Sequence, residues 1–343
     1  MAADNEFKDL LEQIAPRIPR DMFAKYKNVK FDRCFEYSDD DTIDDYIKYA
    51  SNLQAHKLYT GWYTIDKAIG GIRPGQVCTI IAAPNIGKTS CGLNVCYQQI
   101  YCEGDSIVKS GRLIAFFGME TTKYELVERV LQMKLGLSTH EIERKFDKTH
   151  DKYDEEFVEK AREILRELKG IVNITYRISI NELPQYLMAL AEWFKKPVGA
   201  VVIDYLGLLK NLYTRNDYQK ITENMQALSE LAVGLQIPIL NLQTIGRSEV
   251  KDKKKLDMFS GKGSGEIEGS SKIIITLQRV EELDGRYPKS LHDEITAQKK
   301  DLLEMVIHKK KQGYYANTEI EFDKTSLLMT EYHGIPNTEG KPF

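Results

Sequence analysis

Short apolar runs alternate with longer, polar-patterned segments from about residue 60 to residue 330. Seven of these runs are rich in β-branched residues and apolar at nearly every position. They lie at 77–82, 112–118, 171–177, 199–205, 237–243, 272–278 and 303–308. Such runs are typical of strands in a mostly parallel sheet that is covered on both faces. The alternation therefore predicts an α/β fold with a doubly wound sheet.

Several polar-patterned segments between the runs predict helices. Residues 121–136 and 153–170 have this pattern, and the second segment ends in Gly170 after basic residues, which is a helix stop signal. The sequence Ser-Ile-Asn-Glu at 179–182 predicts a capping box that opens the helix leading to Trp193.

The first 58 residues differ from the rest of the chain. They contain a short amphipathic pattern, a proline-containing stretch, an acidic run and then a segment that reads as a helix. This is too little chain for an independent core. We therefore expect a short N-terminal helical extension or linker arm at 1–58, one large domain at 59–330 and a C-terminal tail at 331–343.

Composition narrows the class of protein. With 42% hydrophobic and 29% charged residues, the chain is typical of a globular protein. The net charge of -3 leaves polyanion binding to local basic patches. No apolar run approaches the roughly 18 residues of a membrane span, and the acidic start is not a signal peptide. The cysteines form no C-x-x-C pair, and Cys91 and Cys96 are expected to be buried structural thiols.

The segment CTIIAAPNIGKTS, residues 78–90, matches most of a phosphate-binding loop. The general pattern is G-x-x-x-x-G-K-[ST], and Gly87, Lys88 and Thr89 fit it, while Ala82 stands in place of the first glycine. A buried strand precedes the loop and an apolar helix start follows it, as a working loop requires. The alternative is a chance G-K-T in a strand-to-helix turn.

In such a loop, backbone N–H groups and the positive end of the following helix hold a nucleotide β-phosphate. Lys88 would neutralise phosphate oxygens, and the Thr89 hydroxyl would bind Mg²⁺. A side chain at Gly87 would intrude on the phosphates. The loop residues expected to bind ATP are Ala83, Pro84, Asn85, Ile86, Gly87, Lys88, Thr89 and Ser90.

Two carboxylates follow other buried strands. Asp204 ends the apolar run at 201–203 and would complete the Mg²⁺ shell, while Glu120 follows the run at 116–119 and would orient the attacking water. In a parallel sheet both emerge at the same edge as the phosphate loop. One acid at a strand end is commonly just a solvated group, but together with Lys88 these two predict an ATPase site.

These motifs carry a resemblance to a known family. The run TGWYTIDKAIGGIRPGQVCTIIAAPNIGKTS at 60–90 is similar to the start of the DnaB-type replicative helicase motor domain, whose loop has the form A-x-P-x-x-G-K-T and so accommodates Ala82 and Pro84. Further matches follow in order: FFGMETTKYELVERVL, VVIDYLGLL, ALSELAVGLQIPILNLQTIGRS, GSGEIE and EMVIHKKKQG. The similarity spans about residues 59–325.

The resemblance implies a RecA-like P-loop NTPase that acts as an ATP-dependent DNA helicase. It further implies a hexameric ring on single-stranded DNA, with ATP and Mg²⁺ between subunits and a primase or helicase loader as partner. The expected setting is the cytoplasm of a bacterial or phage-infected cell. The short N-terminal arm suggests a motor-only, phage-encoded or plasmid-borne version, whose arm still carries a helix that docks on a neighbouring subunit.

The chain departs from the family at several positions. Lys311 aligns with the arginine that reaches a neighbour's γ-phosphate, and Lys309 matches the accompanying lysine. Lysine lacks the planar fork of arginine, so this role is weakened or altered. The family's phosphate-sensing glutamine aligns with Thr244, while Gln243 lies one position earlier, and both remain candidates. Two further departures are Lys262 for an arginine and Gly207 for a glutamine.

Two loops are candidates for binding DNA. The glycine-rich segment 247–265 and the segment 210–220 can contact phosphates without reading bases. The basic residues expected to bind are Arg215, Lys220, Arg247, Lys251, Lys253, Lys254, Lys255 and Lys262. Taken alone, such lysines are more often a solvated surface.

Two other functions remain open beside the helicase. One is a RecA-like ATPase with a non-motor role, such as a loader or regulatory ring, which the lysine at 311 favours. The other is a strand-binding recombinase filament, because subunits joined head to tail close into a ring only when their rotation closes.

Overall fold

The computed structural model describes residues 40–211, 217–245, 256, 264–280, 293, 295–310 and 313–332. The chain divides into two compact units, Met1–Asn52 and Leu53–Phe343. The described part of the first unit lies in helix α3 (Asp40–His56), which contains the acidic residues 40, 41, 44 and 45. The expected linker arm and tail otherwise lie outside the described residues.

The second unit is built on one nine-stranded sheet with the order β3-β2-β4-β5-β1-β6-β7-β8-β9. The strands are β1 (Val77–Ala82), β2 (Leu113–Gly118), β3 (Ile171–Ile174), β4 (Val198–Asp204), β5 (Ile239–Thr244), β6 (Ile273–Arg279), β7 (Lys300–Lys310), β8 (Asn317–Asp323) and β9 (Met329–Glu331). β1 to β6 pair in parallel, and β7 to β9 extend the sheet antiparallel. The predicted mostly parallel, RecA-like α/β fold is confirmed.

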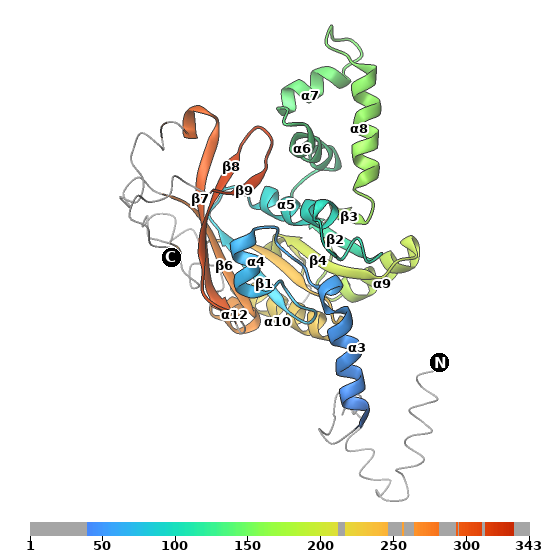
Figure 1. Cartoon of the computed structure of the whole chain (residues 1–343), viewed down its shortest axis with the longest axis vertical. Coiled ribbons are helices and arrows are strands. Elements are labelled where there is room, and N and C mark those ends of the chain that lie inside the picture. The colour runs from blue at the N-terminus through green and yellow to red at the C-terminus, as the bar shows by residue number, and fades with distance from the viewer. Residues whose placement is uncertain are drawn as a thin grey trace, which may run out of the picture. The chain divides into compact units, whose positions relative to one another are not determined.

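Helices cover both faces of this sheet (Figure 1). On one face, α4 (Tyr63–Ile69), α5 (Lys88–Tyr101) and α6 (Lys123–Leu135) share a core with alternate strand residues such as Val202 and Leu242. On the other face, the core contains residues of α9 (Leu183–Phe194), α10 (Asp217–Leu235) and α12 (Ser264–Ser270). Strand residues of opposite parity serve the two cores, which explains why the parallel strands are apolar throughout.

Cys91 and Cys96 lie in the first of these cores, as predicted. Both thiols are buried within α5, and burial raises the pKa of Cys96 to about 12. A thiol with such a pKa stays protonated and unreactive near neutral pH. The two cysteines therefore act as small apolar side chains.

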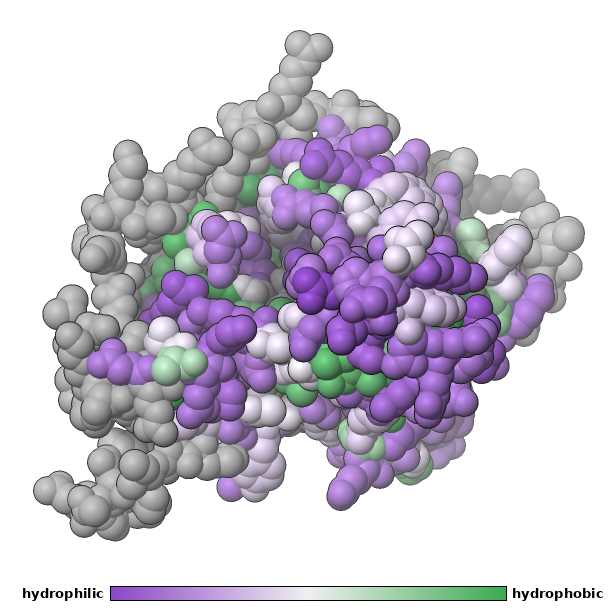
Figure 2. Space-filling model, turned by 90° about the horizontal axis from the view of Figure 1, so that it is seen from above, coloured by the Kyte–Doolittle hydropathy of each residue, from purple (hydrophilic) through white to green (hydrophobic). Residues whose placement is uncertain are grey.

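Three helices form an excursion between β2 and β3 (Figure 1). α6, α7 (Thr139–Phe146) and α8 (Glu155–Glu167) enclose a small core of their own. Thr122 and Ser138 each form a capping box with a glutamate three residues later, which fixes the starts of α6 and α7. The face seen in Figure 2 is mostly hydrophilic, with apolar side chains showing in only a few places.

Two local predictions differ from the structure. The capping box predicted at Ser179 forms only in part: the Glu182 carboxylate accepts from the Ser179 N–H, but the Ser179 hydroxyl accepts from the Asn181 N–H, and α9 begins only at Leu183. The run at 171–177 yields a strand of only four residues, since β3 ends at Ile174. Among the described residues, no helix is both long and apolar enough to cross a bilayer.

Candidate active site

The segment after β1 forms a loop that leads directly into α5. Ala82 is fully buried as the last residue of β1, whereas Pro84 and Asn85 are exposed. α5 begins at Lys88, and its N-cap residue, Gly87, supplies no side-chain hydrogen bond. The first N–H groups of a helix lack partners within the helix. This loop therefore presents free backbone donors and the positive helix end to any anion bound there.

Gly87 cannot be replaced by a residue with a side chain without strain. Its φ of 91° lies in the left-handed region, which glycine adopts readily. A Cβ at this position would also lie 3.0 Å from Met329 Cε and from the ring of Phe322. The glycine is thus required by the neighbouring strands β8 and β9 as well as by the space that phosphates would need.

Thr89 and Asp204 are joined at the base of the loop. The Thr89 hydroxyl donates to Asp204 Oδ2 over 2.6 Å, and Asp204 is only 3% exposed. Burial raises the pKa of Asp204, while the Thr89 hydrogen bond and the charge of Lys88 oppose that rise. A hydroxyl and a carboxylate side by side are oxygen ligands of the kind Mg²⁺ takes. These two residues therefore fit the predicted metal position.

Lys88 and Glu120 share the electrostatic field of Asp204. Burial lowers the pKa of Lys88, and the negative charges of Asp204 and Glu120 raise it again. Glu120 is exposed two residues beyond the end of β2, where Gly118 pairs with Asp204. The structure thus brings Lys88, Thr89, Glu120 and Asp204 to one edge of the sheet.

Sequence reasoning missed one further charge in this cluster. Arg129, on α6, lowers the pKa of Asp204 through its positive charge. It lies in the matched segment FFGMETTKYELVERVL, where a basic residue among alternating apolar positions was the available signal.

The two candidate phosphate sensors lie on opposite faces of the sheet. Gln243 is 1% exposed and shares a face with Asn241, whose side chain contacts Met225 on α10. Thr244 is half-buried and shares a face with Leu242, which packs against Gly92 of α5. Because Asp204 pairs with Leu242 and faces the same way, Thr244 lies on the side of the phosphate loop.

The candidate interface lysines lie at the end of β7. Lys309 donates from Nζ to the carbonyl oxygen of Glu268 in α12. Its neighbour Lys310 lies 4.8 Å from the centroid of the Tyr315 ring, a cation–π contact. Lys311 lies outside the described residues.

Most of the predicted DNA-binding residues also lie outside the described part of the chain: Arg215, Arg247, Lys251, Lys253, Lys254, Lys255 and Lys262. Lys220 is described, and its Nζ donates to the carbonyl oxygen of Gly207 over 2.9 Å. A Cβ at Gly207 would lie 2.6 Å from the Tyr205 ring. The glycine that replaces the family's glutamine thus permits the close approach of Tyr205.

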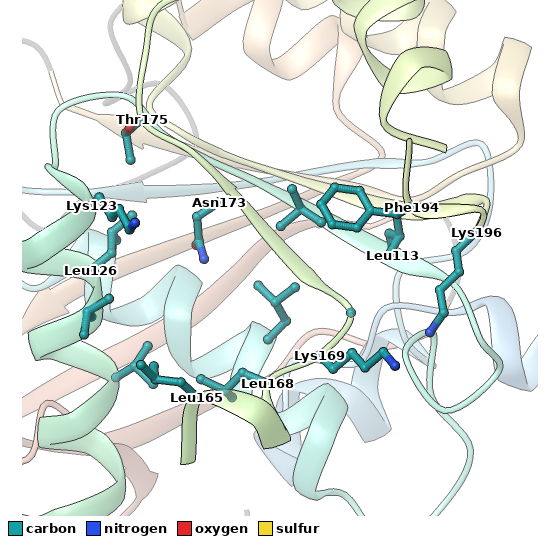
Figure 3. Close-up of a pocket in the computed structure, with 15 residues that line it drawn as sticks. Leu113, Lys123, Leu126, Leu165, Leu168, Lys169, Asn173, Thr175, Phe194 and Lys196 are labelled. Atoms are coloured by element: carbon teal, nitrogen blue, oxygen red, sulfur yellow. The ribbon is translucent and has the colours of Figure 1, made fainter. Parts of the chain in front are cut away.

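A separate apolar groove of about 590 Å³ lies beside β3, away from these residues. α6, the end of α8, β3 and Phe194 supply its lining (Figure 3). Lys169 and Lys196 lie at one end and Lys123 at the other (Figure 3). The groove is therefore apolar along its floor and positively charged at its ends.

The fold and the loop define a P-loop ATPase of the RecA-like class. The family described as "DnaB-like helicase C terminal domain" matches residues 57–331, and the chain belongs to this family. Membership implies nucleotide binding and hydrolysis.

Curated relatives agree with this assignment. The chain is 24% identical over 293 residues to the replicative DNA helicase DnaB of Mycoplasma pneumoniae, covering 83% of this chain and 59% of the relative. It is 27% identical over 225 residues to a probable plasmid replicative DNA helicase of Chlamydia trachomatis, covering 65% and 47%. The chain thus spans about half to three fifths of the length of these relatives.

Solved structures share the fold. The ATPase domain of a phage helicase superposes with a TM-score of 0.68 at 18% identity, covering 87% of this chain and all of that one. A DnaB-like replicative helicase, described together with its interactions with primase, superposes with a TM-score of 0.63 at 16% identity, covering 96% and 75%.

Proposed function

We propose that this protein is an ATP-dependent DNA helicase that moves on single-stranded DNA at replication forks as a ring of subunits. The observation that carries the proposal is the convergence of the phosphate loop, the Thr89–Asp204 pair and Glu120 at one sheet edge within a DnaB-like domain. We place its action in the cytoplasm of a bacterial or phage-infected cell.

ATP would bind with its phosphates against the N–H groups of residues 83–90 and the ammonium of Lys88. Thr89 and Asp204 would hold Mg²⁺, which neutralises charge developing on the phosphates when bound. The Thr89–Asp204 hydrogen bond supports this assignment, because both oxygens already point to one place. Asp204 would lose this shared proton contact as its oxygens turn to the metal.

Glu120 would orient the attacking water and accept its proton. Its exposure at the open edge supports this role, since water must reach it directly. Thr244 would face the γ-phosphate side from the neighbouring strand, and Lys309 and Lys311 would act on the nucleotide of the adjacent subunit. The candidate DNA-binding residues, from Arg215 to Lys262, would contact the strand inside the ring.

Unwinding of a forked DNA duplex tests this function directly. We expect ATP hydrolysis to increase when single-stranded DNA is added and unwinding to require ATP and Mg²⁺. Hydrolysis that ignores DNA, with closed rings and no unwinding, would instead support a loader or regulatory ATPase, which the lysine at 311 favours. Open filaments in electron micrographs would support a recombinase.

Helix α3 supplies a candidate for subunit docking. Ile43, Tyr46 and Ile47 form an apolar stripe at helical spacing and are 58%, 62% and 54% exposed. Asp44 and Asp45 lie beside the stripe. The groove beside β3, with its lysines at the ends, has the complementary chemistry. We propose that α3 of one subunit binds this groove of the next.

Replacing both Ile43 and Ile47 by aspartate is expected to shift the assembly to monomers. The two charges would have to be buried in an apolar groove, which is strongly unfavourable. Mass photometry in the presence of ATP measures the change. The matched control is Lys48→Ala on the same helix, which should leave the ring intact, and an unchanged ring in the double variant would contradict α3 docking.

A further inference from the structure

The turn between β8 and β9, residues 324–328, lies against the phosphate-loop helix; we call it the C-terminal turn. Asp323 orders it, because its Oδ1 accepts hydrogen bonds from the N–H groups of Thr325 and Ser326 at 2.7 and 3.1 Å. The turn therefore has a defined shape before any contact with the helices is considered.

Asn94 of α5 binds both ends of this turn. Its Nδ2 donates to the carbonyl oxygen of Leu327 over 2.9 Å, and its Oδ1 accepts from the N–H of Met329 over 3.0 Å. The same Nδ2 donates to the carbonyl oxygen of Ser90 over 2.7 Å, in the first turn of α5. Asn94 is only 5% exposed, so solvent cannot replace these bonds.

The residues held by Asn94 form a wall of the phosphate loop. The Met329 side chain and the Phe322 ring lie so close to Gly87 that a Cβ there would be 3.0 Å from each. Gly87 precedes Lys88, whose N–H opens the helix. A displacement of Met329 would therefore free the backbone of the loop at the residue that shapes it.

The C-terminal turn also contacts the helix that follows Glu120. Gln132 of α6 donates from Nε2 to the carbonyl oxygen of Thr325 over 3.2 Å, and Gln132 is 7% exposed. α6 begins at Lys123, close behind Glu120. The turn thus joins the helix of the phosphate loop to the helix behind the candidate water-orienting glutamate.

We infer that Asn94 is a positioning residue for the phosphate loop: by holding the C-terminal turn, it fixes the Met329 and Phe322 wall against Gly87 and so sets the affinity of the loop for nucleotide phosphates. The inference rests on the proposed function, in that the loop binds ATP. Asn94 touches neither nucleotide nor metal in this arrangement and acts through the backbone of the turn.

Asn94→Ala tests the inference when it is compared with Gln99→Ala. Gln99 lies on the same helix, is 1% exposed and likewise donates to a backbone carbonyl, that of Tyr59, over 2.8 Å. Both variants should lower the melting temperature. Only Asn94→Ala should raise the KM for ATP and the Kd for a fluorescent ATP analogue, by roughly 10-fold as for loss of a supporting outer residue, with kcat little changed.

Met329→Ala is a second test that leaves Asn94 and its bonds in place. It removes the side chain that packs on Gly87, so it should raise the same two constants, and Met329→Leu should restore them. This pair keeps the inference falsifiable if Asn94→Ala fails to fold.

The outcomes separate the inference from the proposed function. Equal KM values in Asn94→Ala and Gln99→Ala, or a normal KM in Met329→Ala, would overturn the positioning role. A wild-type protein that neither binds nor hydrolyses ATP would overturn the proposed function itself.

Discussion

Lys88→Ala is expected to lower ATP hydrolysis by about 10²–10³-fold, the usual cost of removing one group that stabilises developing charge in a transition state. Lys88 is the cation nearest the phosphate position, and the charges of Asp204 and Glu120 act on it. Its removal also leaves the buried Asp204 without an opposing charge, so the pKa of Asp204 should rise further. Steady-state phosphate release measures the loss.

Lys123→Ala is the matched control, because Lys123 lies on α6 at the groove and not at the phosphate loop. Its hydrolysis rate should equal that of the wild type. Full activity in Lys88→Ala would show that nucleotide chemistry occurs elsewhere in the chain.

Glu120→Gln is expected to reduce hydrolysis by about 10²–10⁴-fold, the range for loss of a general base. The amide keeps the size of the side chain but cannot accept the proton of the attacking water. Since Glu120 lies beyond the loop, ATP binding should persist, and the variant should hold ATP without cleaving it. Single-turnover hydrolysis and equilibrium binding of a fluorescent ATP analogue separate the two effects.

Glu103→Gln, an exposed position after α5, supplies the charge-matched control. Loss of binding in Glu120→Gln that parallels the loss of hydrolysis would assign Glu120 a structural role and remove it from the chemistry.

The parallel part of the fold could be predicted because its signal is local. Each buried strand is apolar at nearly every position, and β1 occupies the predicted 77–82. β8 and β9 were not predicted, because strands at the antiparallel edge alternate buried and exposed residues, as Thr318, Ile320 and Phe322 do with their neighbours. The Ser179 turn was misread because Ser-x-x-Glu also fits a turn that stops short of a helix.

The site was partly predictable for the same reason. Strand ends place Lys88, Asp204 and Glu120 by topology alone, so their spacing along the chain sufficed. The orientation of Gln243 and Thr244 required the sheet register, which sequence parity alone does not fix. The contacts of Asn94 with Leu327 and Met329 join segments 233 and 235 residues apart, and no local pattern announces them.

The sheet order also determines when the nucleotide site can exist during synthesis. β1 lies between β5 and β6, and the Trp62 indole donates to the carbonyl of Met329, 267 residues later. Residues 77–90 therefore leave the ribosome long before their neighbours are made. Contacts of such long sequence separation make folding slow. The apolar β1 and the loop after it must wait, unpaired, for nearly the whole chain, so ATP can help fold this protein only as its last step.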